Sequence, residues 1–552
     1  MILPALLVSR GKYSVAEPMF SDEQRPVLVA RKLRRGAEAG DLVLVNAREK
    51  ARSLRGEVIK VFGPSGDPRN VYDALFASVE TRRDFPKKVK NEADSVAEKE
   101  IDNAHGREDA RHLPTVTIDG DDAKDFDDAI TVERLDPQDA RNGEPAYRVW
   151  VHIADVTHYV EPGGLLDREA RRRGNSVYLP GTVAPMLPER LSNDVCSLRP
   201  GEDRAAVTVE MEVSESGKLT SSRLYRSRIQ SDARLTYDRV DRFLEGEPAE
   251  SAEVEHPEMI QAAHELSRRL KSRAAERGKL EIGGREPDYE MSEKRLPVKA
   301  SVRRSTESRE LIEELMILAN VATAGMLMER HGGVFRVHEE PDADDLEKLE
   351  ARLAAIGVQE EPSPENLGEI AAENDSDGVK YLILRSLPRA YYSPHNMGHF
   401  GLALENYTHF TSPIRRYSDV LVHRALLGEA PPEDIEEIAA DISEREYRSM
   451  ICERTADDYT LMWLMRERVG DTLEGTVVGT ASFGFFVELD EGATGMVHVS
   501  KLPGWWELEE SGVVISNPEI GASYRVGDRV LVELMDVRPL MRRAELRVVK
   551  RL

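Results

Sequence analysis

The chain has 552 residues, 40% hydrophobic and 32% charged, which gives room for three or four domains and is typical of a soluble protein. Its net charge of −25 argues against a uniformly basic nucleic-acid-binding surface. The charge is unevenly distributed, however: residues 1–90 carry 18 Lys and Arg against 11 Asp and Glu, whereas the remainder carries 58 against 90. A basic N-terminal region on an acidic body permits a local electrostatic track, and bound metal ions would offset part of the acidity.

The chain shows no targeting or disulfide pattern. No apolar run approaches the length of a membrane span, and residues 1–8 lack the basic flank and cleavage site of a signal peptide. Cys196 and Cys452 lie far apart and form no zinc-type spacing, so we interpret them as buried free thiols. These features predict a cytoplasmic protein that does not contact a membrane.

The N-terminal region divides into two parts. Residues 1–62 are expected to form a small β-barrel of the OB or cold-shock type, because 40–46 and 56–62 read as short strands rich in β-branched residues. Residues 63–110 open with Gly-Pro-Ser-Gly-Asp-Pro and remain highly charged. They are interpreted as a connector that lies along the next domain.

Residues 111–468 show mixed α and β patterns. Strands are expected at 115–118, 129–134, 147–154, 205–213 and 218–230. Helices are expected at 256–276, 309–330, 342–356, 417–428 and 433–468. The overall prediction is an α+β multidomain protein, with a mixed α/β central domain between small OB-type barrels.

Residues 469–552 return to short strands and predict a five-stranded OB-type barrel. Phe483 and Phe485 are candidates to stack on nucleic-acid bases, and Lys501 is a candidate phosphate contact. Alternation along a strand puts Phe485 opposite its neighbour Phe486, so one of the two faces must be core.

The stretch 119–128 (DGDDAKDFDD) holds six aspartates between two β-prone runs. Carboxylates so close together repel one another and are costly to bury unless cations neutralise them. Mg²⁺ is the natural candidate, because it takes oxygen ligands and keeps water for a phosphate substrate. A solvated acidic turn is the alternative, whereas an EF-hand loop is excluded by the spacing.

Several sequence blocks together resemble the ribonuclease II/ribonuclease R family, whose catalytic part is the RNB domain. They are 118–129 (IDGDDAKDFDDA), 151–156 (VHIADV), 178–181 (YLPG), 185–198 (PMLPERLSNDVCSL), 399–404 (HFGLAL) and 411–417 (TSPIRRY). The resemblance covers about 110–468, and the segment 469–552 resembles the S1 RNA-binding domain that follows RNB in this family.

The resemblance implies processive 3′-to-5′ hydrolysis of single-stranded RNA to nucleoside 5′-monophosphates, assisted by two Mg²⁺ ions, with Mn²⁺ as an alternative. It also implies a monomer with single-stranded RNA as its partner and no obligate protein partner. The chemistry agrees, because metal ions can activate water and stabilise both oxygens of an in-line displacement at phosphorus.

By the match to this family, the implied metal ligands are Asp119, Asp125, Asp127 and Asp128. Asp127 and Asp128 are also assigned to catalysis, together with Arg415 and Glu453. Arg415 suits this role because a guanidinium forks onto phosphate oxygens and stays charged.

The resemblance also implies residues that contact RNA. Tyr178 would stack on the 3′-terminal base, and Tyr289 resembles a second RNA-contacting tyrosine. A buried tyrosine with a satisfied hydroxyl is the alternative for Tyr178. Arg416 is a candidate contact to backbone phosphates, with a plain surface arginine as the alternative.

Two departures from the family bear on the substrate. The N-terminal region has room for one cold-shock domain, where most bacterial members have two, and the C-terminus lacks a Lys-rich tail. We therefore expect digestion of single strands rather than of structured RNA. The alternative function is a catalytically silent RNA-binding regulator, which the presence of all four matched aspartates and Arg415 disfavours.

Overall fold

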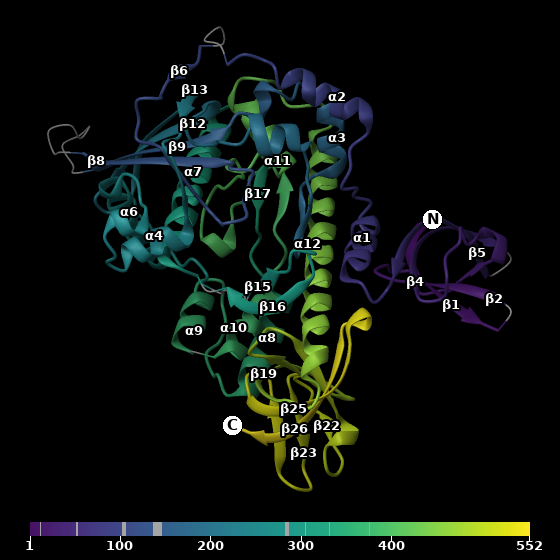
Figure 1. Ribbon diagram of the computed structural model, residues 1–552. Helices are drawn as coiled ribbons and strands as arrows, with labels where there is room; N and C mark the ends of the chain where they lie inside the picture. The colour runs from purple at the N-terminus through teal and green to yellow at the C-terminus, as the bar shows by residue number, and fades with distance from the viewer. Residues whose placement is uncertain are drawn as a thin grey trace.

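The computed structural model describes residues 1–11, 13–50, 53–101, 106–135, 146–281, 286–303, 305–330, 332–374 and 376–552. It shows a large central body and two small barrels, each of which holds one end of the chain (Figure 1).

The N-terminal barrel is closed, with strand order β1-β2-β3-β5-β4. Its strands are β1 (Ile2–Arg10), β2 (Tyr13–Pro18), β3 (Val27–Val29), β4 (Asp41–Lys50) and β5 (Ser53–Pro64). Alternation along β1 points Leu3, Ala5 and Leu7 into the barrel, where all three are buried. The expected N-terminal β-barrel is confirmed.

The connector contains two helices, α1 (Pro68–Ser78) and α2 (Lys87–Val96). The Asp67 side chain caps α1 by accepting a hydrogen bond from the Arg69 N–H at 3.0 Å. The hydroxyls of Tyr72 on α1 and Thr460 on the long helix α12 (Ile435–Met465) lie 2.7 Å apart and are buried. Through this contact α1 docks the N-terminal barrel against α12.

The central body is built on a seven-stranded sheet, with order β14-β7-β8-β9-β12-β13-β6. The pairs β14–β7 and β13–β6 are parallel, and the other pairs are antiparallel. The strands are β6 (Glu108–Asp109), β7 (Val116–Asp119), β8 (Asp128–Arg134), β9 (Ala146–Ala154), β12 (Asp203–Ser214), β13 (Leu219–Gln230) and β14 (Ala233–Thr236). The five strands expected between 115 and 230 are confirmed.

The helices expected in the central region are confirmed as α6 (Pro257–Glu276), α7 (Glu307–Arg330), α8 (Ala343–Ile356), α11 (Tyr417–Leu426) and α12. The shorter helices are α3 (Leu165–Arg173), α4 (Tyr237–Leu244), α5 (Ala249–Ala252), α9 (Leu367–Glu373) and α10 (Asp377–Ser386). Three two-stranded pairs complete the body: β10 (Val177–Leu179) with β11 (Thr182–Ala184), β15 (Glu286–Met291) with β16 (Pro297–Arg303), and β17 (Phe335–Val337) with β18 (Tyr391–Ser393).

Helix α7 is long and apolar enough to cross a membrane by length and composition, and within the described residues no other helix is. Most of its apolar segment is buried, however, and Leu311, Leu315 and Ala319 belong to the core of the central body. Its hydrophobicity therefore reflects its position inside the protein.

The C-terminal barrel is closed, with order β19-β20-β21-β26-β25. Its strands are β19 (Thr472–Ala481), β20 (Gly484–Leu489), β21 (Thr494–His498), β25 (Arg529–Arg538) and β26 (Arg543–Arg551), with an inserted sheet of β22 (Glu507–Leu508), β23 (Val514–Asn517) and β24 (Ala522–Arg525). The last turns of α12 add Leu461, Met462 and Met465 to the barrel's core. Helix α12 thus runs from the central body into this barrel (Figure 1).

Candidate active site

The loop that carries the aspartates connects the end of β7 to the start of β8. The Ser197 hydroxyl braces it from the side, accepting a hydrogen bond from the Phe126 N–H at 3.0 Å and donating to the Lys124 carbonyl at 2.7 Å. Arg234 donates to the carbonyls of Gly120 and Asp121, at 2.7 and 2.6 Å. The loop is therefore held by contacts to its backbone, which leaves its carboxylates available.

Asp127 joins this loop to the segment that carries Arg415. The residue is 4% exposed, and Oδ1 accepts a hydrogen bond from the Ile414 N–H at 2.8 Å. Oδ2 lies 3.6 Å from Nε of Arg415, whose side chain remains 47% exposed. Two sequence blocks that lie far apart in the chain therefore meet, and the arginine keeps room to contact a substrate.

The aspartates perturb one another. Burial and the neighbouring carboxylate of Asp128 raise the pKa of Asp119 to about 8. Burial raises the pKa of Asp128 to about 6, although Arg415 and Arg416 oppose the shift. Burial also raises the pKa of Asp127 well above its ordinary value. Without a cation, these carboxylates are costly to keep ionised together.

The donor set fits a hard divalent cation. Oδ2 of Asp119 is buried without a hydrogen-bond partner in the described part of the chain, which is the situation of a ligand atom without its ion. The available donors are carboxylate oxygens, the ligands that Mg²⁺ prefers. Within the described ranges, however, no three Asp, Glu, His or Cys side chains already converge to hold a metal ion.

Tyr178 and Glu453 form one wall of the site. Tyr178 lies on β10, and its hydroxyl donates to Oδ2 of Asp125 at 3.1 Å. Its backbone N–H donates to Oε1 of Glu453 on α12 at 2.8 Å. The residue is 41% exposed, so Tyr178 is not a core tyrosine. Burial raises the pKa of Glu453 to about 7.

The sequence left open whether Arg416 is a plain surface arginine, and the structure shows that it is not. Its guanidinium is turned toward Asp419, with Nη2 2.7 Å from Oδ1. Asp419 is fully buried and also accepts hydrogen bonds from the Ser412 N–H at 2.7 Å and the Ser418 hydroxyl at 2.8 Å. Arg416 therefore braces the segment that presents Arg415. Both arginines also line a cavity of about 740 Å³.

Sequence reasoning missed Ser197, Arg234 and Asp419. They act through backbone groups of segments far away in the chain, so no local pattern marks them. Ser197 and Asp419 do fall within or directly beside sequence blocks that carry the family resemblance.

Known protein families match the chain in the order expected. The RNB domain matches residues 107–428, and the S1 RNA binding domain matches residues 466–548. Ribonuclease R of Vibrio cholerae is 36% identical over 563 residues, covering 95% of this chain and 67% of that protein. The chain belongs to the ribonuclease R family of exoribonucleases.

Two further members of the family support this assignment. Ribonuclease R of Thermotoga maritima is 37% identical over 507 residues, covering 86% of this chain and 70% of that protein. The structure of Mycoplasma genitalium RNase R in complex with ribose-methylated single-stranded RNA has a TM-score of 0.88 at 25% identity, covering 100% of this chain and 90% of that one. The chain thus spans about two thirds of the curated relatives' length.

The S1 barrel corrects the expectation for Phe485, which is 0% exposed and stacks on Tyr524 with ring centroids 4.5 Å apart. Gly484 precedes it at a φ of +153°, where a Cβ atom would lie 2.1 Å from the Val497 carbonyl oxygen. Phe485 is therefore core. Phe486, the next residue of β20, lies on the opposite face because side chains alternate along a strand. Phe483 precedes β20 in the turn, and its ring packs edge-on against that of Phe486, with ring centroids 6.2 Å apart.

Phe483 and Phe486 line a cavity of about 540 Å³ that also contains Arg538, Arg542 and Arg543. Aromatic rings beside guanidinium groups suit single-stranded nucleic acid. Lys501 is exposed on the same domain. Tyr289 is half-buried against the S1 core, and its hydroxyl donates to the Asp457 carbonyl of α12 at 3.4 Å, so it lies between the RNB and S1 parts.

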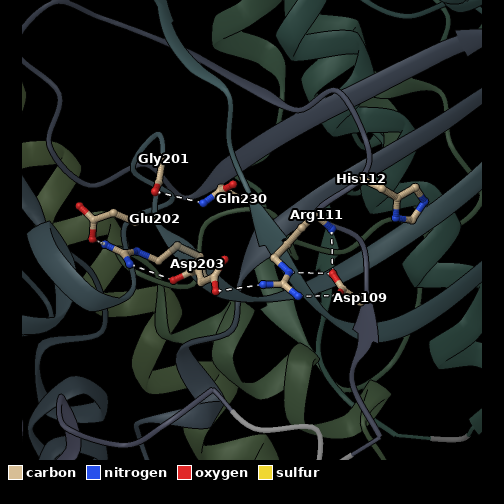
Figure 2. Close-up of a pocket in the computed structure, with 8 residues that line it drawn as sticks. Asp109, Arg111, His112, Gly201, Glu202, Asp203 and Gln230 are labelled. Atoms are coloured by element: carbon tan, nitrogen blue, oxygen red, sulfur yellow. Dashed lines mark hydrogen bonds and ion pairs between the residues drawn. The ribbon is translucent and has the colours of Figure 1, made fainter.

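A cavity of about 970 Å³ lies elsewhere, where β6 meets the ends of β12 and β13 (Figure 2). Its charges neutralise one another: Arg111 pairs with Asp109 at 2.6 Å and with Asp203 at 3.3 Å. Arg204 pairs with Glu202 at 2.5 Å. No site residue predicted from the sequence lines it, so this cavity is separate from the candidate active site.

Proposed function

We propose that this chain is a metal-dependent, processive exoribonuclease that removes nucleoside 5′-monophosphates from the 3′ end of single-stranded RNA. The observation that carries the proposal is the hydrogen bond from Ile414 to Asp127, which holds Arg415 beside the aspartate loop. The structures of RNA-bound family members support RNA as the substrate.

The proposed metal ligands are Asp119, Asp125, Asp127 and Asp128, which would hold two Mg²⁺ ions, with Mn²⁺ as the alternative. When bound, these ions supply an activated water and neutralise charge on the oxygens at phosphorus. The water oxygen forms a bond to phosphorus, the bond to the upstream 3′-oxygen breaks, and that oxygen leaves with a proton.

The protein's own side chains bind and orient the RNA. The exposed Arg415 guanidinium is placed to grip the oxygens of the scissile phosphate. The Tyr178 ring stacks on the 3′-terminal base, and its hydroxyl is fixed by Asp125. Glu453 holds the backbone of Tyr178, so it lies beside the leaving nucleotide.

We infer that both barrels hold the RNA upstream of the cut. Helix α1 carries the N-terminal barrel to Thr460 of α12, and the S1 barrel packs around the end of that helix. RNA held at both barrels would stay bound while its 3′ end advances, which is what processive digestion needs. We propose a cytoplasmic monomer that needs no protein partner.

Digestion of a 5′-labelled single-stranded oligoribonucleotide, with and without a chelator, tests this function. A ladder that shortens progressively from the 3′ end and requires Mg²⁺ is the expected result. Tight RNA binding without cleavage would instead support the silent regulator, and internal cuts would indicate an endonuclease.

A further inference from the structure

A cavity of about 740 Å³ begins beside Arg415 and runs along α12. Tyr178, Arg415 and Glu453 line one part of it, and its α12 lining continues N-terminally past Tyr447 and the neighbouring Arg389 to Ala440. Tyr447 precedes Glu453 by six residues, which corresponds to roughly 9 Å along the helix. Tyr447 and Arg389 therefore lie within the cavity, one short step along the helix from the residues beside the reaction centre.

The cavity lies on the side of the reaction centre away from both barrels. The N-terminal barrel is connected through α1 to Thr460, and the S1 barrel packs on Leu461 and Met465, all C-terminal to Glu453. The rest of the α12 lining, from Ala440 to Met450, lies N-terminal to Glu453. RNA that comes over the barrels thus reaches Glu453 and Arg415 before it reaches Arg389.

The charges in the cavity single out Arg389. Two of its other arginines are neutralised, Arg336 by Glu446 and Arg416 by Asp419. Arg389 is exposed and has no carboxylate partner among the residues that the structure describes. Its guanidinium instead lies 3.8 Å from the ring centroid of Tyr447, which fixes it by a cation–π contact.

An exonuclease that works from the 3′ end releases its product ahead of the RNA that it still holds. The nucleoside 5′-monophosphate cannot leave through the channel that the remaining RNA fills, so it needs a second opening. The departing molecule carries a phosphate and a base, which an unpaired guanidinium and an aromatic ring can bind.

We propose that Arg389 and Tyr447 form an exit site for the nucleoside 5′-monophosphate, an assignment that rests on the proposed function. Arg389 binds the phosphate after it leaves Arg415 and the aspartates. The ring of Tyr447 holds the guanidinium of Arg389 against its face, at the mouth of the cavity. The product passes from Arg415 to Arg389 while the RNA keeps its position behind it.

Calorimetric binding of AMP to the full chain, with a chelator present and no RNA, tests the site. The variant Arg389→Ala is expected to bind AMP about tenfold more weakly, because the phosphate loses a charged hydrogen-bond donor. Arg389→Lys should recover part of the loss because it keeps the charge. Adenosine, which lacks the phosphate, should bind wild type and Arg389→Ala equally.

Arg448→Ala is the matched control. Arg448 is exposed next to Tyr447 on the same helix, but it pairs with Glu444 at 2.7 Å and does not line the cavity. It should bind AMP like wild type. Equal AMP affinity in wild type, Arg389→Ala and Arg448→Ala would overturn the exit site.

The RNA digestion assay on wild type separates the two proposals. If RNA is shortened from its 3′ end while wild type and Arg389→Ala bind AMP with equal affinity, the exit site is wrong and the exonuclease function stands. If AMP binding depends on Arg389 while RNA is not shortened, the exonuclease function fails and Arg389 remains a nucleotide-binding residue.

Discussion

Asp127 accepts a hydrogen bond of 2.8 Å from the backbone N–H of Ile414, and 287 positions of sequence separate the two. The same carboxylate lies 3.6 Å from Arg415, the residue after Ile414. One buried side chain thus fixes the distance between the proposed metal ligands and the arginine that faces the phosphate. Any change in the fold that separated β8 from the 411–417 segment would take the site apart.

Tyr178→Ala is expected to lengthen the smallest RNA fragment left at the end of digestion while the chemical step continues. Stacking on a terminal base is worth about 1–3 kcal/mol. That is a small share of the binding of a long RNA but a large share for a few nucleotides, so digestion stalls earlier. The measurement is gel analysis of the end products.

Tyr178→Phe is the control for this experiment, because it keeps the ring and removes only the hydroxyl that donates to Asp125. It should leave the end product close to that of wild type. An unchanged smallest fragment in Tyr178→Ala would show that the ring does not hold the RNA end.

Phe483→Ala combined with Phe486→Ala should weaken binding of a long single-stranded RNA, with little effect on a very short one. Both rings line the cavity with Arg538 and Arg542, and each base–aromatic stack contributes about 1–3 kcal/mol. Affinity for the two RNA lengths is the measurement. Equal losses at both lengths would place the barrel's contacts at the reaction centre instead.

Phe485→Ala should act on stability. Phe485 is fully buried, and truncating such a ring typically costs about 3–5 kcal/mol, so the S1 barrel should unfold at lower temperature or urea concentration. A variant that melts like wild type but loses RNA affinity would contradict the core assignment.

Asp155→Asn should destabilise the central body at neutral pH. Its carboxylate pairs with the buried Arg107 at 2.6 Å, and breaking such a pair leaves an uncompensated charge at a cost of about 3–5 kcal/mol. Burial alone would raise the pKa of Asp155, but Arg107, Arg226 and the Thr157 hydroxyl offset it, and the pKa lies below its ordinary value.

The sign of the pH dependence follows from that lowered pKa. The stabilisation is fully present above the unfolded pKa of about 3.9 and is lost as the pH falls through the folded pKa. The difference in urea midpoint between wild type and Asp155→Asn should therefore shrink at low pH. Asp109→Asn, at an exposed ion pair, should change the midpoint little at either pH.

The sequence sufficed where a local pattern decides the structure. The aspartates of 119–128 follow one another between two strands, so their proximity needed no tertiary information. Period-2 alternation likewise separated Phe485 from Phe486, but it does not tell which face packs inward. That choice depends on Tyr524, which lies on the later strand β24 of the inserted sheet and packs its ring against Phe485.

Tertiary contacts account for what could not be predicted. Arg234 holds the aspartate loop by donating hydrogen bonds to the backbone carbonyls of Gly120 and Asp121. Every residue has a backbone carbonyl, so no sequence pattern marks this contact. Whether Arg416 meets solvent or Asp419 depends on how the segment after Thr411 turns into α11. The exit site was equally hidden, because Arg389 and Tyr447 meet only when the strand β18 packs beside α12.

The most direct test of the central claim is the single-turnover rate at which Asp127→Asn removes the 3′-terminal nucleotide from a 5′-labelled RNA at saturating Mg²⁺. Asparagine keeps the shape and can still accept the Ile414 hydrogen bond, so the fold and RNA affinity should survive. Loss of its charge should slow cleavage about 10²-fold or more. Asp122→Asn, at an exposed position of the same loop, should cleave like wild type. A folded Asp127→Asn protein that cleaves at nearly the wild-type rate would contradict the assignment of this loop as the reaction centre.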